Sequence, residues 1–204
     1  MTEPGTPETP PDQPASAWQA PPAATPVPGT AGFVYADVPN RVIALIIDGI
    51  ILAIITFIVT AVLYGIVGAP VSVNLNTGNL FEVNYVSTLL GAILSLAIGA
   101  AYWIYSWTAM RASPGQKMLG MQVGNSPDGA TLTQEQAIRR WAVLFAPFSL
   151  SAVVYVLPTL GALLGLATFI YAIYLLYTTA QSPTKQGFHD KFANTVVVKA
   201  SRTV

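Results

Sequence analysis

The sequence predicts an all-α membrane protein: four transmembrane helices, a small cytoplasmic β element and a disordered, Pro-rich N-terminal tail. Of its 204 residues, 53% are hydrophobic and 9% are charged, against roughly 25% charged in an average globular chain. The apolar residues form long blocks, and the basic residues lie between or beside these blocks. The formal net charge is zero, so the chain does not have the excess of basic residues that is typical of nucleic-acid-binding proteins. The absence of cysteine excludes disulfides and Cys-based metal centres. We therefore expect an integral membrane protein in contact with the lipid bilayer and without a nucleic-acid partner.

Residues 1–32 differ in composition from the rest of the chain. Nine of the 16 prolines fall within the first 28 residues, and no apolar stretch precedes Phe33. Such a segment buries too little apolar surface to offset the entropy cost of ordering, so we expect a disordered cytoplasmic tail. A second role stays open, in which the tail docks into a groove of a partner protein. Residues 33–200 are expected to form one transmembrane domain.

Three apolar blocks supply the predicted helices. The first two, 42–68 and 86–110, each exceed the length of about 18 residues that marks a membrane-spanning helix. The third block is 36 residues long, and as one helix it would extend about 54 Å, well beyond a hydrocarbon core of about 30 Å. Pro158 in its middle interrupts helical hydrogen bonding. This block is therefore expected to form two spans, at about 141–157 and 161–177, joined by a tight turn.

The distribution of basic residues sets the number of spans. With four spans, every Lys and Arg lies on one side of the membrane, and the positive-inside rule makes that side the cytoplasm. With three spans, the basic residues after the last helix would be stranded outside. We therefore predict a multi-pass protein of the cell membrane with both termini cytoplasmic, a cytoplasmic loop at 111–140 and a cytoplasmic C-terminal segment at 178–204. The basic residues are Arg41, Arg111, Lys117, Arg139, Arg140, Lys185, Lys191, Lys199 and Arg202.

The segments outside the membrane carry signals for strands and turns. The apolar run 118–123, a cluster of turn-forming residues and the short run 130–133 indicate a strand, a turn and a second strand. Residues 133–136 match a capping box that opens the third helix. A β-branched run at 195–199 lies on the same side, and we expect it to pair with the first run in a small sheet. On the other side, the alternation over 71–76 predicts a marginal hairpin.

Two further patterns concern how the helices contact each other and the lipid. The second helix carries a small residue at every fourth position, which forms a groove that another helix can approach closely. This groove predicts packing within the chain, with a homo-oligomer through the same face as the alternative. Aromatic residues near the cytoplasmic helix ends predict anchoring at the membrane interface. The small residues are Ser87, Gly91, Ser95 and Gly99, and the aromatic residues include Tyr102, Trp103, Tyr105 and Trp107.

Asp48 is the only ionisable residue inside an apolar block. A carboxylate at mid-bilayer costs about 3 kcal/mol on insertion scales, and such groups usually line a pathway or pair with a partner. Arg41 precedes Asp48 by two helical turns and projects from nearly the same face. Two interpretations stay open. Asp48 lines an ion path, or it lies at the cytoplasmic interface in a structural pair with Arg41.

His189 and Asp190 follow the fourth helix closely, on the predicted cytoplasmic side. His189 is the only histidine, and the chain has neither a cysteine nor a second histidine to complete a metal site. We therefore expect no metal site and no cofactor. The sequence also lacks Gly-x-Ser-x-Gly, Ser-x-x-Lys and a phosphate-binding loop. We expect no catalytic residue and no enzymatic activity.

Three segments in order resemble the RDD family of small bacterial and archaeal membrane proteins, named for one arginine and two aspartates. Residues 41–48 are similar to its Arg-x-x-Ala-x-x-x-Asp opening. Residues 113–123 resemble its Pro-Gly-Lys-Arg-Leu-Leu-Gly-Leu segment, with Gln116 in place of the first basic residue. His189, Asp190 and Lys191 open a segment similar to His-Asp-Lys-x-Ala-x-Thr-x-Val-Val. The resemblance covers roughly residues 35–200. The resemblance implies that the arginine and the two aspartates for which the family is named are Arg41, Asp48 and Asp190. His189 and Lys191 are supporting residues of the same site.

The resemblance implies a multi-helix membrane domain and, as suggested for some members, cation/proton antiport. In that hypothesis the protein is an antiporter or an accessory to a transporter. Asp48 exchanges a proton for a cation, Arg41 acts on it electrostatically, and Asp190 orients from the cytoplasmic side. The alternative is a non-transporting scaffold or assembly partner that recruits proteins through its Pro-rich tail and cytoplasmic loop. In this alternative Arg41, Asp48 and Asp190 form a folding clamp.

Overall fold

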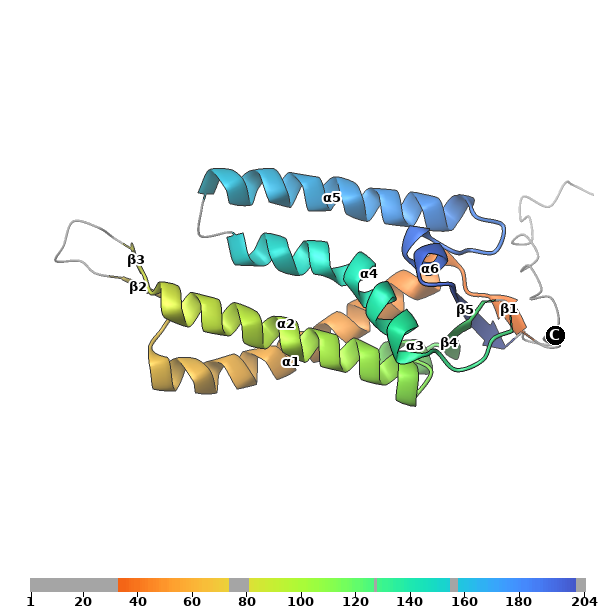
Figure 1. Cartoon of the computed structure of the whole chain (residues 1–204), viewed down its shortest axis with the longest axis horizontal. Helices are drawn as coiled ribbons and strands as arrows, with labels where there is room; N and C mark the ends of the chain where they lie inside the picture. The colour runs from red at the N-terminus through yellow and green to blue at the C-terminus, as the bar shows by residue number, and fades with distance from the viewer. Residues whose placement is uncertain (1–32, 74–80, 127, 155–157, 201–204) are drawn as a thin grey trace, which may run out of the picture.

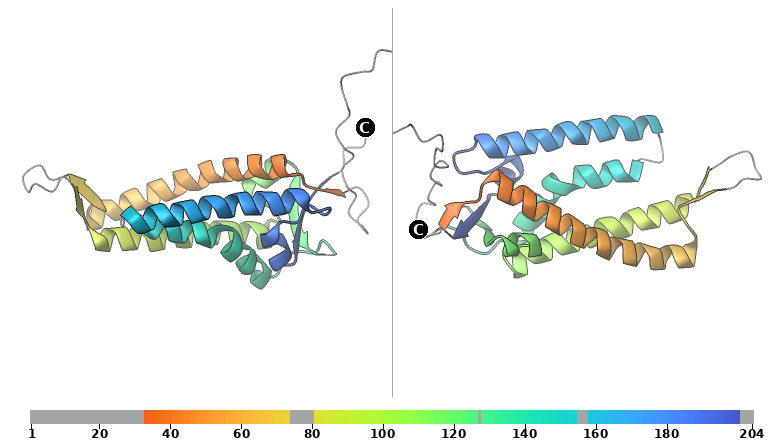
Figure 2. Two further views of the ribbon diagram at one scale, coloured as in Figure 1. Left: turned by 90° about the horizontal axis from the view of Figure 1, so that it is seen from above. Right: turned by 180° about the vertical axis from the view of Figure 1, so that it is seen from behind.

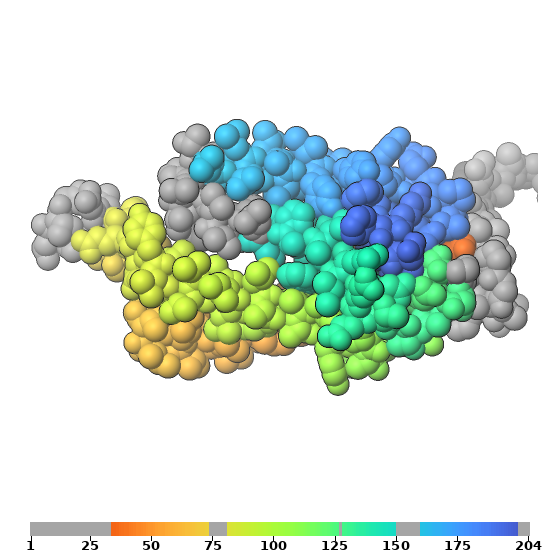
Figure 3. Space-filling model, in the orientation of Figure 1, coloured from red at the N-terminus to blue at the C-terminus, as the bar shows by residue number. Residues whose placement is uncertain are grey.

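The computed structural model describes residues 33–73, 81–126, 128–154 and 158–200, and all structural statements concern these residues. Four long helices run along a common axis, with a small sheet and two short helices at one end and a hairpin at the other (Figure 1). One antiparallel pair is formed by α1 (Val38–Val67) and α2 (Tyr85–Ala109), and the other by α4 (Gln134–Val154) and α5 (Pro158–Gln181) (Figure 2). The atoms of α4 lie between those of α5 and α2 on the face shown in Figure 3.

Three of the described helices have the length and composition of membrane spans: α1, α2 and the Leu160–Gln181 stretch of α5. The chain is therefore a multi-pass membrane protein. The third apolar block does form two helices, as predicted, with α4 and α5 running antiparallel (Figure 1). A role of α4 as a fourth span stays a prediction. The predicted disordered tail, residues 1–32, lies outside the described residues.

Local signals explain where the helices begin. Pro39 lies in the first turn of α1 and Pro158 is the first residue of α5, positions where the missing N–H of proline leaves no helical bond unmade. The predicted capping box before α4 is confirmed. The Thr133 amide donates to Gln136 Oε1 at 3.1 Å, and the Gln136 amide donates to Thr133 Oγ1 at 3.2 Å.

The sheet at one end of the bundle is antiparallel, in the order β1 (Phe33–Tyr35), β5 (Thr195–Ala200), β4 (Met121–Asn125). Val123 is paired with Val197, and Tyr35 with Val198. The predicted pairing of the loop with the C-terminal run is thus confirmed. The loop strand begins at Met121, because the preceding residues form the short helix α3 (Pro114–Met118).

Of two further strand predictions, the one in the loop is wrong and the one in the hairpin is confirmed. The predicted strand at 130–133 is wrong, because Ala130 closes a turn in which its carbonyl accepts from the Asn125 amide at 2.8 Å. The hairpin at the opposite end is confirmed, with β2 (Val71–Val73) paired to β3 (Phe81–Val83). Its predicted turn lies outside the described residues.

The small-residue face of α2 packs against α1. Ser87 and Gly91 are buried, and the Ser87 hydroxyl donates to the Val67 carbonyl at 3.1 Å. The Tyr64 hydroxyl fills the space that a side chain at Gly91 would take. Packing within the chain therefore uses this half of the face, while Ser95 is only half-buried. A homo-oligomer through the face stays a prediction.

The hydrophobic core lies near the sheet end of the bundle. Trp103 and Trp107 are 4% and 1% exposed, and Trp103 stacks on Phe145 with ring centroids 4.6 Å apart. The interfacial anchoring predicted for these two tryptophans is therefore wrong, because both pack between α2 and α4. Tyr105, on the outer face of α2, is 63% exposed. Most other exposed apolar side chains cover α1, α2 and α5, as expected of helices in contact with lipid.

Candidate functional site

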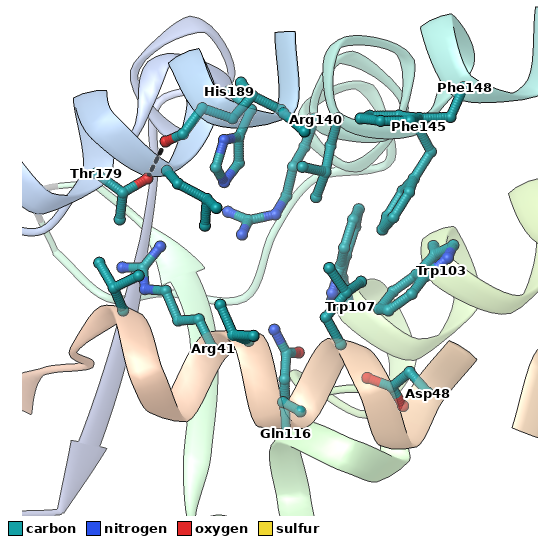
Figure 4. A pocket seen from close by; sticks show the side chains of 18 residues that line it. Arg41, Asp48, Trp103, Trp107, Gln116, Arg140, Phe145, Phe148, Thr179 and His189 are labelled. Carbon is teal, nitrogen blue, oxygen red and sulfur yellow. Dashed lines mark hydrogen bonds between the residues drawn. The ribbon is translucent and has the colours of Figure 1, made fainter. Parts of the chain in front are cut away.

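A cavity of about 330 Å³ lies between the two helix pairs, near the sheet end. All four long helices line it, and α3 and α6 (Phe188–Phe192) close it with Gln116 and His189 (Figure 4). Its wall is mostly apolar. The polar or charged side chains that line it are Arg41, Asp48, Gln116, Arg140, Thr179 and His189, together with the indole ring of Trp107.

Asp190 joins three elements beside this cavity. Its carboxylate is fully buried and accepts from Arg41 Nη1 at 2.6 Å and from Arg140 Nη1. The Gly187 amide at the start of α6 donates to the same carboxylate at 3.2 Å. Burial alone would raise the pKa of Asp190. The charges of Arg140, His189 and Arg41 lower this pKa by a larger amount, so it lies well below 3.8 and the carboxylate is ionised. Two guanidinium groups thus share one carboxylate in this cluster, and the other carboxylate that borders the cavity is that of Asp48.

Arg140 is the main site residue that the sequence interpretation missed. Its neighbour Arg139 pairs with Glu135 on the surface at 2.5 Å, whereas Arg140 is 2% exposed. The Arg140 guanidinium carbon lies 4.9 Å from the centroid of the Trp107 ring, within reach of a cation–π interaction. A signal existed, because Arg140 shares a helix face with the apolar Ala137 and Leu144.

Asp48 belongs to a separate cluster. Its carboxylate is fully buried and accepts from the Tyr102 hydroxyl at 2.7 Å, from the Gly115 amide at 2.7 Å and from the Ser113 hydroxyl. It thus caps the amino end of α3, where backbone amides lack helical partners. The direct pairing of Asp48 with Arg41 that we considered from the sequence is not among the ion pairs of the described residues, in which Arg41 is paired with Asp190.

His189 lies over the Asp190 cluster, with its Nε2 3.5 Å from Asp190 Oδ2. Burial lowers the pKa of His189 from 6.5 to about 4, and the charges of Arg140 and Arg41 add to this, against the opposing effect of Asp190. The imidazole is therefore neutral at pH 7. Lys191 is exposed and does not line the cavity. In the described part of the chain, no group of three His, Cys, Asp or Glu side chains is placed to hold a metal ion.

Several buried N–H donors around the cavity have no partner among the described residues: Arg41 Nη2, Arg140 Nε and Trp107 Nε1. His189 Nδ1 is unpaired in the same way. Leaving a buried polar group unpaired costs about 1–3 kcal/mol. These four residues all line the cavity, so an occupant that reaches the unpaired atoms and accepts hydrogen bonds from the donors would remove part of this cost.

The comparison with protein families covers most of the chain. The model of the RDD family matches residues 35–194, a range that includes Arg41, Arg140 and Asp190 as well as Asp48. No curated protein and no solved structure matches the chain. With Arg41, Asp48 and Asp190 inside the matched range, the chain belongs to the RDD family.

Proposed function

We propose that this RDD protein is transport-related and that the cavity between its helix pairs is the substrate site. The observation that carries the proposal is the cavity itself, which is lined by all four long helices and bordered by buried charged side chains. Ionisable residues buried within a membrane bundle commonly mark a substrate or ion pathway. The protein either moves the substrate itself or serves as an accessory to a transporter.

Cation/proton antiport is the most concrete form of this proposal. Asp48 lines the cavity and is the acid available to exchange a proton for a cation. Its oxygens already accept from Tyr102, Ser113 and Gly115, so a cation must displace at least one of these donors. Asp48→Asn removes the exchangeable charge while keeping the side-chain shape.

Everted membrane vesicles enriched in the full chain test this form. A pH-sensitive dye follows ΔpH after addition of Na⁺, Li⁺ or K⁺, with Leu176→Phe as the variant that narrows the cavity. Ile173→Phe is the matched control, because Ile173 is 52% exposed on the same helix and does not line the cavity. We expect a cation-dependent collapse of ΔpH in the parent chain and in Ile173→Phe, and a weaker one in Asp48→Asn and Leu176→Phe. A normal collapse in Leu176→Phe would exclude the cavity from the pathway. No collapse in any correctly inserted chain would exclude antiport and leave the accessory role.

The second candidate is a non-transporting scaffold. It is favoured by apolar side chains exposed on the short helices outside the spans, since Met118 of α3 is 72% exposed and Phe192 of α6 is 54% exposed. Deletion of residues 1–32 tests it, together with Phe192→Ser. Loss of one identified co-purifying protein with ΔpH responses unchanged would support a scaffold. Unchanged co-purification in both variants would reject it.

A further inference from the structure

We propose that the cavity binds the acidic head group of a single-chain amphiphile, of the fatty-acid type, that enters from the lipid between α1 and α5. The inference rests on the proposed role of the cavity as a substrate site, but it does not depend on cation flux.

One side of the cavity has the chemistry of an anion site. Arg41 and Arg140 share the single carboxylate of Asp190, and each keeps a buried N–H donor without a partner among the described residues. Trp107 adds a third such donor. All three groups can only donate, so only an acceptor satisfies them, and two arginines against the single carboxylate of Asp190 at this end of the cavity favour an anion there. Asp48, the acid that lines the cavity, has its oxygens engaged by its own donors.

The rest of the cavity suits a hydrocarbon chain. Figure 4 shows the guanidinium groups of Arg41 and Arg140 on the side nearer His189, and the rings of Trp103 and Phe145, together with the carboxylate of Asp48, on the other side. The lining is dominated by aliphatic and aromatic side chains from α1, α4 and α5. One molecule with a charged end and an apolar end matches both sides at once.

The cavity opens toward lipid. Leu45 of α1 and Leu176 of α5 both line the cavity, yet they are 44% and 47% exposed. A ligand that passes between α1 and α5 therefore comes from the apolar phase. At about 330 Å³ the cavity is at the lower end for small-molecule sites, so it holds a head group and the first part of one chain, with the remainder outside.

Tryptophan quenching tests the inference on the purified full chain in nanodiscs of zwitterionic lipid. The probe is 2-bromohexadecanoate, whose bromine on C2 lies next to the carboxylate and would approach Trp103 and Trp107. We expect saturable quenching by the acid and only weak, non-saturable quenching by its methyl ester. Equal quenching by the ester would overturn the head-group assignment. Displacement of the acid by acetate at similar concentration would show a site for free anions and overturn the amphiphile. No saturable quenching would mean that water satisfies the donors, and it would also overturn the inference.

Two variants separate binding from folding. Arg41→Lys keeps the positive charge but removes the unpaired Nη2 donor, and we expect affinity to fall about tenfold. Leu176→Phe narrows the opening at an exposed position and should weaken binding, whereas the control Ile173→Phe should leave it unchanged. Parental affinity in both Arg41→Lys and Leu176→Phe would overturn the inference. Binding without any vesicle response would retain this inference and exclude cation/proton antiport, while a vesicle response without binding would remove only this inference.

Discussion

The backbone amide of Gly115 donates a hydrogen bond of 2.7 Å to Oδ1 of Asp48, and so attaches α3 to α1 across 67 residues of sequence. Gly115 lies so close to α1 that a Cβ there would lie 2.9 Å from Asp48 Cγ and would collide with the Ala44 carbonyl oxygen. Only a residue without a side chain permits this approach.

Gly115→Ala should therefore lower the free energy of unfolding by about 1–3 kcal/mol, because backbone cannot give way as a flexible side chain can. Thermal unfolding in detergent micelles measures the change. Gly99→Ala is the matched control, since nothing lies within 4 Å of a Cβ at Gly99 and alanine has the better helix propensity. Equal unfolding temperatures of Gly115→Ala and Gly99→Ala would contradict the close contact between Gly115 and α1.

Neighbouring arginines of α4 should respond very differently to the same substitution. Arg140→Gln leaves the fully buried Asp190 with Arg41 as its remaining arginine, and we expect a loss of about 3 kcal/mol or more. Arg139→Gln breaks only an exposed pair with Glu135 and should cost less than about 1 kcal/mol. Unfolding midpoints of the two variants, compared in the same detergent, measure the difference. Similar losses would mean that Arg140 is not buried as described.

Two tyrosines of α2 give a similar comparison for the Asp48 cluster. Tyr102→Phe removes a donor to a buried carboxylate, so stability should fall by about 1.5–3 kcal/mol. Tyr105→Phe alters a hydroxyl on a side chain that is 63% exposed and should change stability little. If Tyr102→Phe were neutral in thermal unfolding, the Tyr102 hydroxyl would not be a significant partner of Asp48.

His189 and Asp190 should affect the free energy of unfolding in two different pH ranges. Between pH 6.5 and 4 the unfolded chain protonates His189 and the folded chain does not, so the folded state loses stability as pH falls through this window. At about 1.4 kcal/mol per pH unit the loss reaches about 3 kcal/mol. The contribution of Asp190 is present above pH 3.8 and is lost as pH falls further, because its folded pKa is lowered.

His189→Gln should therefore flatten the unfolding profile between pH 6.5 and 4 and retain the steep loss below pH 4. Unfolding midpoints measured at half-unit pH intervals provide the comparison. The same slope in the parent chain and in His189→Gln would show that His189 is not the titrating group.

Much of the fold was accessible from sequence because lipid imposes long apolar blocks and proline marks their interruption. Pro158 separated α4 from α5, and β-branched residues marked β5. The start of α1 was placed too late, since Asn40 and Arg41 are polar although they are helical. Strand β1 was missed because three residues carry little pattern and its partner lies at the far end of the chain.

The site was accessible only in part. Motif resemblance identified Arg41, Asp48 and Asp190, but spacing on one helix suggested a pair between Arg41 and Asp48. In the structure Arg41 and Asp48 are not paired. The carboxylate of Asp48 accepts a hydrogen bond from the start of α3, and the carboxylate that pairs with Arg41 is Asp190, which accepts one from the start of α6. Such long-range contacts leave no periodic trace in the sequence, whereas the helical spacing of Arg140 with Ala137 and Leu144 was a signal that the interpretation did not use.

The position of β5 has a consequence for biosynthesis. It is the last strand or helix among the described residues, yet it is the central strand between β1 and β4. Neither outer strand has a partner in the sheet until residues 195–200 have left the ribosome. Insertion of α1 can therefore precede the completion of the sheet by the time taken to translate the rest of the domain. A nascent chain stalled before Thr195 would sit in the membrane with its helices present and its first and last segments still unjoined.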